Sequence, residues 1–104
     1  MTTEEAVPDL SSIKSGFMAD MVSGGKVTKK VLLAEAIVNT VRKASEEGDI
    51  IGLEELGKLR SAAEQAGVEI LLKKADWRGE EPDEAVLKLA YDGGYALVTS
   101  SERL

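Results

Sequence analysis

The sequence predicts an α/β domain: a three-layer sandwich in which a central parallel sheet of about four strands carries helices on both faces. Apolar runs of strand length alternate with longer amphipathic segments, which is the pattern of strands joined by helical crossovers. Apolar residues make up 43% of the chain and charged residues 31%, as is ordinary for a globular protein. Because 104 residues suffice for one modest core, we expect a single domain over residues 1–104.

Short apolar runs predict strands over residues 6–9, 26–33, 68–72 and 95–99. Apolar residues at helical spacing predict helices over residues 10–22, 34–47, 53–66 and 82–93, most of which end at a glycine. Pro82 suits the first turn of the last helix, and Asp83 follows at its positive end. Trp77 is the one large apolar residue of the polar loop before that helix, so we expect it to form a lid or an interface anchor.

Composition excludes several kinds of chemistry. The chain has no cysteine and no histidine, which rules out disulfides, thiolate zinc sites, cysteine nucleophiles and imidazole catalysis. A net charge of -6 argues against nonspecific attraction to nucleic-acid phosphates. The acidic N-terminus and the lack of a long apolar run predict a cytoplasmic protein with no membrane partner. Any chemistry therefore rests on carboxylates, hydroxyls or lysines.

Candidate functional residues follow the predicted strands, because ligands of parallel α/β sheets bind beyond the carboxyl ends of the strands. These residues are Asp9 and Ser11 after the first strand, Glu35 after the second, and Ser100, Ser101 and Glu102 after the last, with Asp83 opening the preceding helix. Carboxylates that converge at such an edge suit Mg²⁺ or Mn²⁺, which prefer oxygen ligands.

Purely structural roles would also account for the presence of these candidate residues at their positions. Asp9 has the position of a helix N-cap, and Asp83 and Glu35 lie in first turns of helices, each a common arrangement that contributes about 0.5–1 kcal/mol. The glycines do not have the spacing of a phosphate-binding loop. Lys26, Lys29 and Lys30, on and around the second strand, are typical of residues that blunt a sheet edge.

A set of segments carries a family resemblance. The segment Val7–Ser11 is similar to V-P-D-T-S, Ala34–Val38 to P-E-A-V-V, and Gly48–Leu56 to G-R-E-I-G-F-E-G-L-E-E-L at a shortened spacing. Near the end, Asp83–Val86 is similar to D-A-L-I and Leu97–Ser101 to L-I-T-S-D. Together these segments resemble the PIN domain family of magnesium-dependent nucleases, in particular the archaeal and bacterial PIN domains joined to a TRAM domain or an ATPase.

The resemblance implies a PIN-like fold with an acidic metal site that is incomplete here. Asp9 and Asp83 match family acids, which implies catalytic and metal-binding roles for them. Thr40, Ser101 and Ser15 stand where further family acids are expected. The nearest carboxylates available to replace the missing ligands are Glu35 and Glu102, although Glu35 lies about 140° around the helix from Thr40.

We therefore expect a degenerate PIN-like domain with weak or lost nuclease activity that serves as an RNA- or protein-interaction module. Its weak metal site for Mg²⁺ or Mn²⁺ would comprise Asp9, Asp83, Glu35 and Glu102, with Ser11, Thr40 and Ser101 beside it. The alternatives are an active metal-dependent ribonuclease that hydrolyses phosphodiesters with this reduced carboxylate set, and an α/β domain whose PIN likeness is structural only. Single-stranded RNA or a protein is the expected partner, and an exposed sheet edge predicts a homodimer.

Overall fold

The computed structural model describes residues 2–74 and 82–100, and at residues 82 and 83 it describes the backbone alone. The strands are β1 (Thr3–Pro8), β2 (Val27–Ala34), β3 (Glu69–Lys73) and β4 (Ala96–Val98). The helices are α1 (Leu10–Lys14), α2 (Phe17–Ser23), α3 (Glu35–Glu46), α4 (Ile51–Ala66) and α5 (Pro82–Gly93). Trp77 lies outside the described residues.

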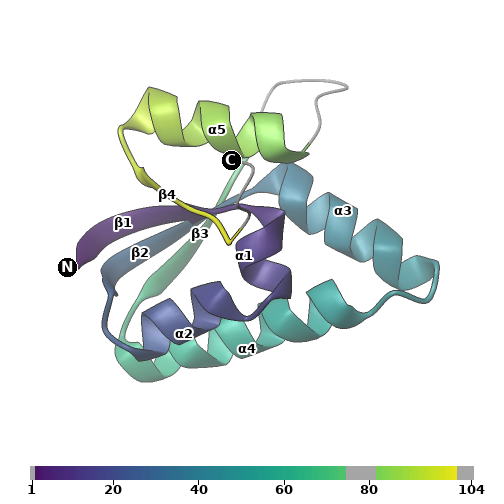
Figure 1. The fold of residues 1–104 in the computed structure, drawn as a ribbon, viewed down its shortest axis with the longest axis horizontal. Coiled ribbons are helices and arrows are strands. Elements are labelled where there is room, and N and C mark those ends of the chain that lie inside the picture. Colours follow the sequence, from purple (N-terminus) through teal and green to yellow (C-terminus); the bar gives the residue numbers. More distant parts are fainter. Residues whose placement is uncertain (1, 75–81, 101–104) are drawn as a thin grey trace.

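The four strands form one parallel sheet in the order β3-β2-β1-β4. Helices α3 and α5 lie on one side of the sheet, and α1, α2 and α4 lie on the other (Figure 1). The predicted three-layer α/β fold is therefore confirmed. No helix among the described residues is long and apolar enough to cross a membrane.

The core is aliphatic, and it is built mainly around β2. Val31, Leu32 and Ala34 of this strand are almost completely buried. A strand covered on both faces carries consecutive apolar residues instead of alternating ones, which explains the uninterrupted run at the end of β2. Helices fill the space on both sides with fully buried residues such as Met18, Ile37 and Leu59.

The prediction that lysines blunt an edge at the second strand is wrong, because β2 is an inner strand. Lys29 instead forms an ion pair with Glu4 of β1, with 3.3 Å between Nζ and Oε2. Lys30 lies in register between Glu5 of β1 and Glu69 of β3. The amino-terminal half of β2 is thus bordered by acids from both of its neighbours.

The helix predicted over residues 10–22 is two helices, α1 and α2, which Gly16 separates. Gly16 has φ +83°, in the left-handed region that favours glycine. Apolar spacing continues through the break, with Ile13 and Met18 both buried. The break leaves α1 as a short helix that begins at the carboxyl end of β1.

The order of the strands creates a switch point beside β1. The chain passes from β1 to β2 on one side of it and returns by way of β3 and α5 to β4 on the other side. Open α/β sheets bind ligands where the connections diverge in this way, beyond the carboxyl ends of the strands. Asp9 follows β1 directly and therefore lies at this point.

Two glycine substitutions should change stability in opposite directions. Gly16→Ala should lower the free energy of unfolding by about 1–2 kcal/mol, because alanine is strained at a positive φ. Gly57→Ala, inside α4 where an added Cβ meets nothing within 4 Å, should raise it by up to about 1 kcal/mol. Urea unfolding measures both changes, and a shift of the same sign in the two variants would contradict the assigned backbone conformations.

Candidate functional site

The carboxylate of Asp9 is buried at the carboxyl end of β1, with only 1% of the residue exposed. Its Oδ1 accepts hydrogen bonds from the Ser11 hydroxyl and the Ser12 backbone N–H, each at 2.8 Å. Its Oδ2 accepts a hydrogen bond from the Thr99 hydroxyl at 2.5 Å. Both oxygens of the carboxylate are therefore engaged by groups of the chain itself.

Sheet register and helix capping together put Asp9 in this position. Pro8 pairs with Val98, so the next residues of β1 and β4, Asp9 and Thr99, come out side by side. The Asp9 N–H donates to the Val98 carbonyl at 3.0 Å, which extends this pairing by one bond. Asp9 is also the N-cap of α1, as the capping interpretation predicted. One side chain thus joins β1, α1 and β4.

Hydroxyl groups surround Asp9, and we call Ser11, Ser12, Ser15, Thr99 and Ser100 the hydroxyl cluster. The Ser15 hydroxyl donates to the Ser100 hydroxyl at 3.2 Å, and the Ser100 N–H donates to Ser11 Oγ at 3.3 Å. Ser11 Oγ and Thr99 Oγ1 are 3.3 Å apart. The Ser12 hydroxyl donates to the Asp9 carbonyl at 2.9 Å. The cluster consists of neutral groups around one carboxylate.

Glu35 and Thr40, both on α3, contribute no further charge to Asp9. Glu35 is half-buried at the start of the helix, and it has no hydrogen bond or ion pair with Asp9 in the part of the chain that the structure describes. The Thr40 hydroxyl donates to the Ala36 carbonyl of its own helix at 2.8 Å. Thr40 also lines a small cavity together with Lys14 of α1. The position where the family resemblance implies a glutamate therefore borders a lysine.

The remaining predicted site residues are only partly placed. Asp83 lies in the first turn of α5, as predicted, but its side chain is outside the described part of the structure. Ser101 and Glu102 lie outside the described residues. The site that the structure describes at this edge is consequently Asp9 with the hydroxyl cluster.

The donors that the structure describes at this edge do not by themselves fit a magnesium site. Mg²⁺ in proteins is held by carboxylates and waters in octahedral geometry, and it needs carboxylate oxygens that can turn toward the ion. The described residues contain no group of three or more Asp, Glu, His or Cys side chains that would hold a metal ion. The oxygens of Asp9 point instead into bonds with Ser11, Ser12 and Thr99. We therefore derive no reaction step through a metal.

Sequence reasoning selected Asp9, both as a candidate ligand and as the cap of the helix that contains Ser12, and it selected Ser11, but it missed Thr99 as their partner. The position of Asp9 directly before a helical segment is a local signal for the cap, because an N-cap side chain accepts from the backbone N–H three residues later, here that of Ser12. Thr99 had no local signal. Its contact with Asp9 depends on β4 pairing with β1, which the order of the strands decides.

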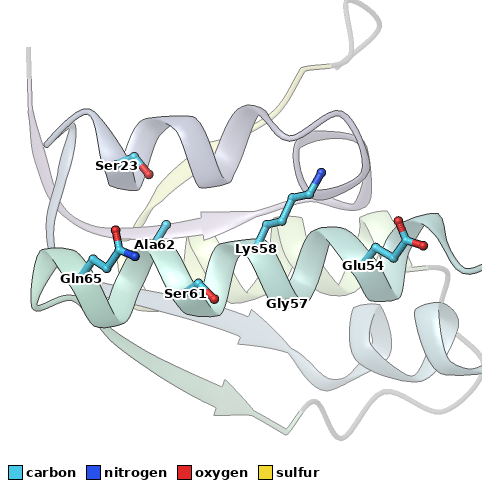
Figure 2. Close-up of a pocket in the computed structure, with 7 residues that line it drawn as sticks. All are labelled: Ser23, Glu54, Gly57, Lys58, Ser61, Ala62 and Gln65. Carbon is cyan, nitrogen blue, oxygen red and sulfur yellow. The ribbon is translucent and has the colours of Figure 1, made fainter.

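A groove lies away from this edge, along the surface of α4. It has a volume of about 560 Å³ and is open to solvent, and all lining residues except Ser23 come from α4 (Figure 2). Its lining includes small and polar side chains, among them Gly57, Ser61 and Gln65. None of the predicted site residues lines it. Lys58 and Glu54 also line it, and the ammonium of Lys58 is paired with Glu55 at 3.1 Å.

No family model matches the chain, and no curated protein matches it in sequence. Among solved structures, the chain is similar to a domain of a functionally unknown protein from Methanocaldococcus jannaschii DSM 2661. The two share 20% sequence identity with a TM-score of 0.82, and the match covers 97% of this chain and 81% of that one. At this identity the likeness shows the fold alone, so function has to be argued from the site.

Removal of the Asp9 carboxylate should destabilise the fold. Asp9→Ala should lower the free energy of unfolding by about 3 kcal/mol, because the cap of α1 and the acceptor for Thr99 are lost together. Asp9→Asn keeps one acceptor oxygen and should cost about 1–2 kcal/mol. Asp20→Ala, an exposed carboxylate on α2, is the control and should stay within about 0.5 kcal/mol of the unsubstituted protein. If Asp9→Ala were as mild as this control, the buried network would have no structural role.

Proposed function

We propose that this chain is a degenerate PIN-like domain that has weak or no nuclease activity and works in the cytoplasm as an interaction module. The observation that carries the proposal is the hydroxyl cluster, which occupies both oxygens of the buried Asp9 carboxylate. The motifs that resemble the PIN family supply the expectation of an acidic site at this place. The arrangement around Asp9 supports a structural use of the one acid that the structure describes there.

Electrostatics supports the loss of catalysis. Metal-dependent phosphodiester hydrolysis needs several carboxylates to hold the cation and to orient the attacking water. Ser15, which stands at the position of one family acid, lies within the hydroxyl cluster beside Ser100. Thr40, at another such position, is bonded to its own helix. Hydroxyls at these positions supply oxygen atoms but no negative charge, so a cation would be held weakly.

Charge favours a protein partner over RNA. The chain has 19 acidic and 13 basic residues, and the resulting net charge of -6 repels a phosphate backbone. Single-strand binders also use aromatic side chains as stacking platforms, and here only four residues are aromatic, or 4% of the chain. We therefore place protein interaction first, and RNA binding is the other outcome of the test below.

A cleavage assay tests the proposal. Incubated with single-stranded RNA and Mn²⁺, the protein should show no cleavage above that of the Asp9→Asn variant, because Asp9 is occupied by hydroxyl donors. Calorimetric titration with Mg²⁺ or Mn²⁺ should detect no site at millimolar ion concentration. In the same samples, fluorescence anisotropy should show no saturable binding of the RNA at physiological salt.

Each alternative has a distinct result. Cleavage that Asp9→Asn abolishes, together with a saturable metal titration, would establish the active ribonuclease that uses Asp9, Asp83 and a displaced Glu35 or Glu102. Saturable RNA binding without cleavage would instead make the domain an RNA-binding module. Either result would overturn the proposal of a protein-interaction module with weak or no nuclease activity.

A further inference from the structure

We propose that β3 is a dimerisation edge, at which the strand pairs antiparallel with β3 of a second copy about a twofold axis through Leu71. The inference rests on the interaction role proposed above and names its partner and surface. It depends on neither RNA nor metal, so it can fail or succeed independently of the cleavage assay.

The first observation is an open edge. The strand order places β3 at one side of the sheet, where β2 is its neighbour and no other described strand pairs with it (Figure 1). The backbone N–H and C=O groups of an edge strand are a template for pairing with another chain. The opposite edge, β4, has three residues against the five of β3, so β3 offers the longer ladder.

The second observation is exposed apolar surface on this strand. Leu72 lies within β3, yet 55% of it is exposed. Its register partner on β2 is Leu33, which is buried, and Ile70 of β3 is similarly paired with the buried Val31. The apolar row that begins at the buried residues of β2 therefore reaches the edge of the sheet and becomes exposed at Leu72. A second copy would extend that face with further apolar residues.

The third observation is the charge symmetry of the strand, whose residues read Glu-Ile-Leu-Leu-Lys from Glu69 to Lys73. A twofold axis through Leu71 places Glu69 opposite Lys73 of the second copy, and it does so twice. The same axis places Ile70 opposite Leu72 of the second copy. Opposite charges and apolar pairs directly across two antiparallel strands are both stabilising.

The charge pattern selects this register. Two residues directly opposite each other in an antiparallel pair have their side chains on the same face of the sheet. In the neighbouring registers that keep this arrangement, each residue therefore faces a residue two positions away from its original partner. A shift in one direction sets Glu69 opposite Leu71, and a shift in the other sets Lys73 opposite Leu71. Both shifts lose the complementary charges. The register centred on Leu71 is therefore favoured over its two neighbours.

The charges also continue a pattern that already crosses the sheet. Glu5 of β1 is in register with Lys30 of β2, and Lys30 is in register with Glu69 of β3. Lys73 of the second copy is the next position in this row, so acidic and basic residues would alternate from Glu5 of β1 to the edge strand of the second copy, where Ala34 follows Lys73. Like charges opposed at this point would break the alternation.

Two single charge reversals and their mixture test the proposal. Sedimentation equilibrium of the full chain should detect a dimer whose population rises with concentration. Glu69→Lys should raise the dissociation constant by about tenfold, and Lys73→Glu should do the same, because each variant opposes like charges at both ends of the interface. An equimolar mixture of the two variants restores opposite charges at both ends, so a mixed dimer should form within about threefold of the original affinity.

Lys43→Glu, at an exposed position on α3, is the control for net charge and should leave the dissociation constant unchanged. Circular dichroism checks that each variant folds. A chain that stays monomeric at every concentration, or a dimer whose dissociation constant neither reversal changes, would overturn the proposal. A dimer that each reversal weakens but that mixing does not restore would overturn the register. These measurements use no RNA or metal. A negative result here is therefore independent of the result of the cleavage assay.

Discussion

The buried carboxylate of Asp9 is the constraint on which the carboxyl edge of this fold depends. A charged group taken out of water costs several kcal/mol unless hydrogen bonds satisfy it. Here the donors come from α1 and from the end of β4, so both elements must be in place before the charge is compensated. This requirement matters most for β4, which is three residues long and pairs with β1 alone.

The same interaction explains how one carboxylate is accommodated among the residues that the structure describes at this edge. Asp9 is the only buried carboxylate among the described residues, and the other carboxylates of that part of the chain lie at least partly in solvent. Neutral hydroxyls around Asp9 satisfy its charge without the repulsion that further carboxylates would add. The net charge of -6 is therefore mainly a property of the surface. The proposed association of two copies would have to overcome this charge, so the complementary pairs of Glu69 and Lys73 would be important to it.

Local sequence patterns predicted the fold class well, because apolar runs and periodic segments report burial directly. The break at Gly16 was missed because the apolar spacing from Ile13 to Met18 continues through it. The left-handed backbone conformation of Gly16 does not change that spacing, so the spacing could not reveal it. The inner position of β2, which made the edge prediction for its lysines wrong, and the contact of Thr99 with Asp9 both depend on strand order. Strand order is decided by packing across the whole sheet, so no local pattern revealed either one. The Asp9 cap, in contrast, is a local interaction and was predicted from its spacing.

A double-mutant cycle between Asp9 and Thr99 tests most directly whether the carboxylate acts as a structural junction. The free energies of unfolding of Asp9→Ala, Thr99→Val and the double variant, measured in urea, yield the coupling between the two side chains. We expect a coupling of about 1 kcal/mol or more that Mn²⁺ leaves unchanged, while Thr28→Val, at an exposed threonine on β2, stays within about 0.5 kcal/mol of the original protein. A coupling near zero would show that the contact between Asp9 and Thr99 does not stabilise the fold, and a coupling that disappears when Mn²⁺ is added would show that Asp9 is available to a cation. Either result would contradict this account.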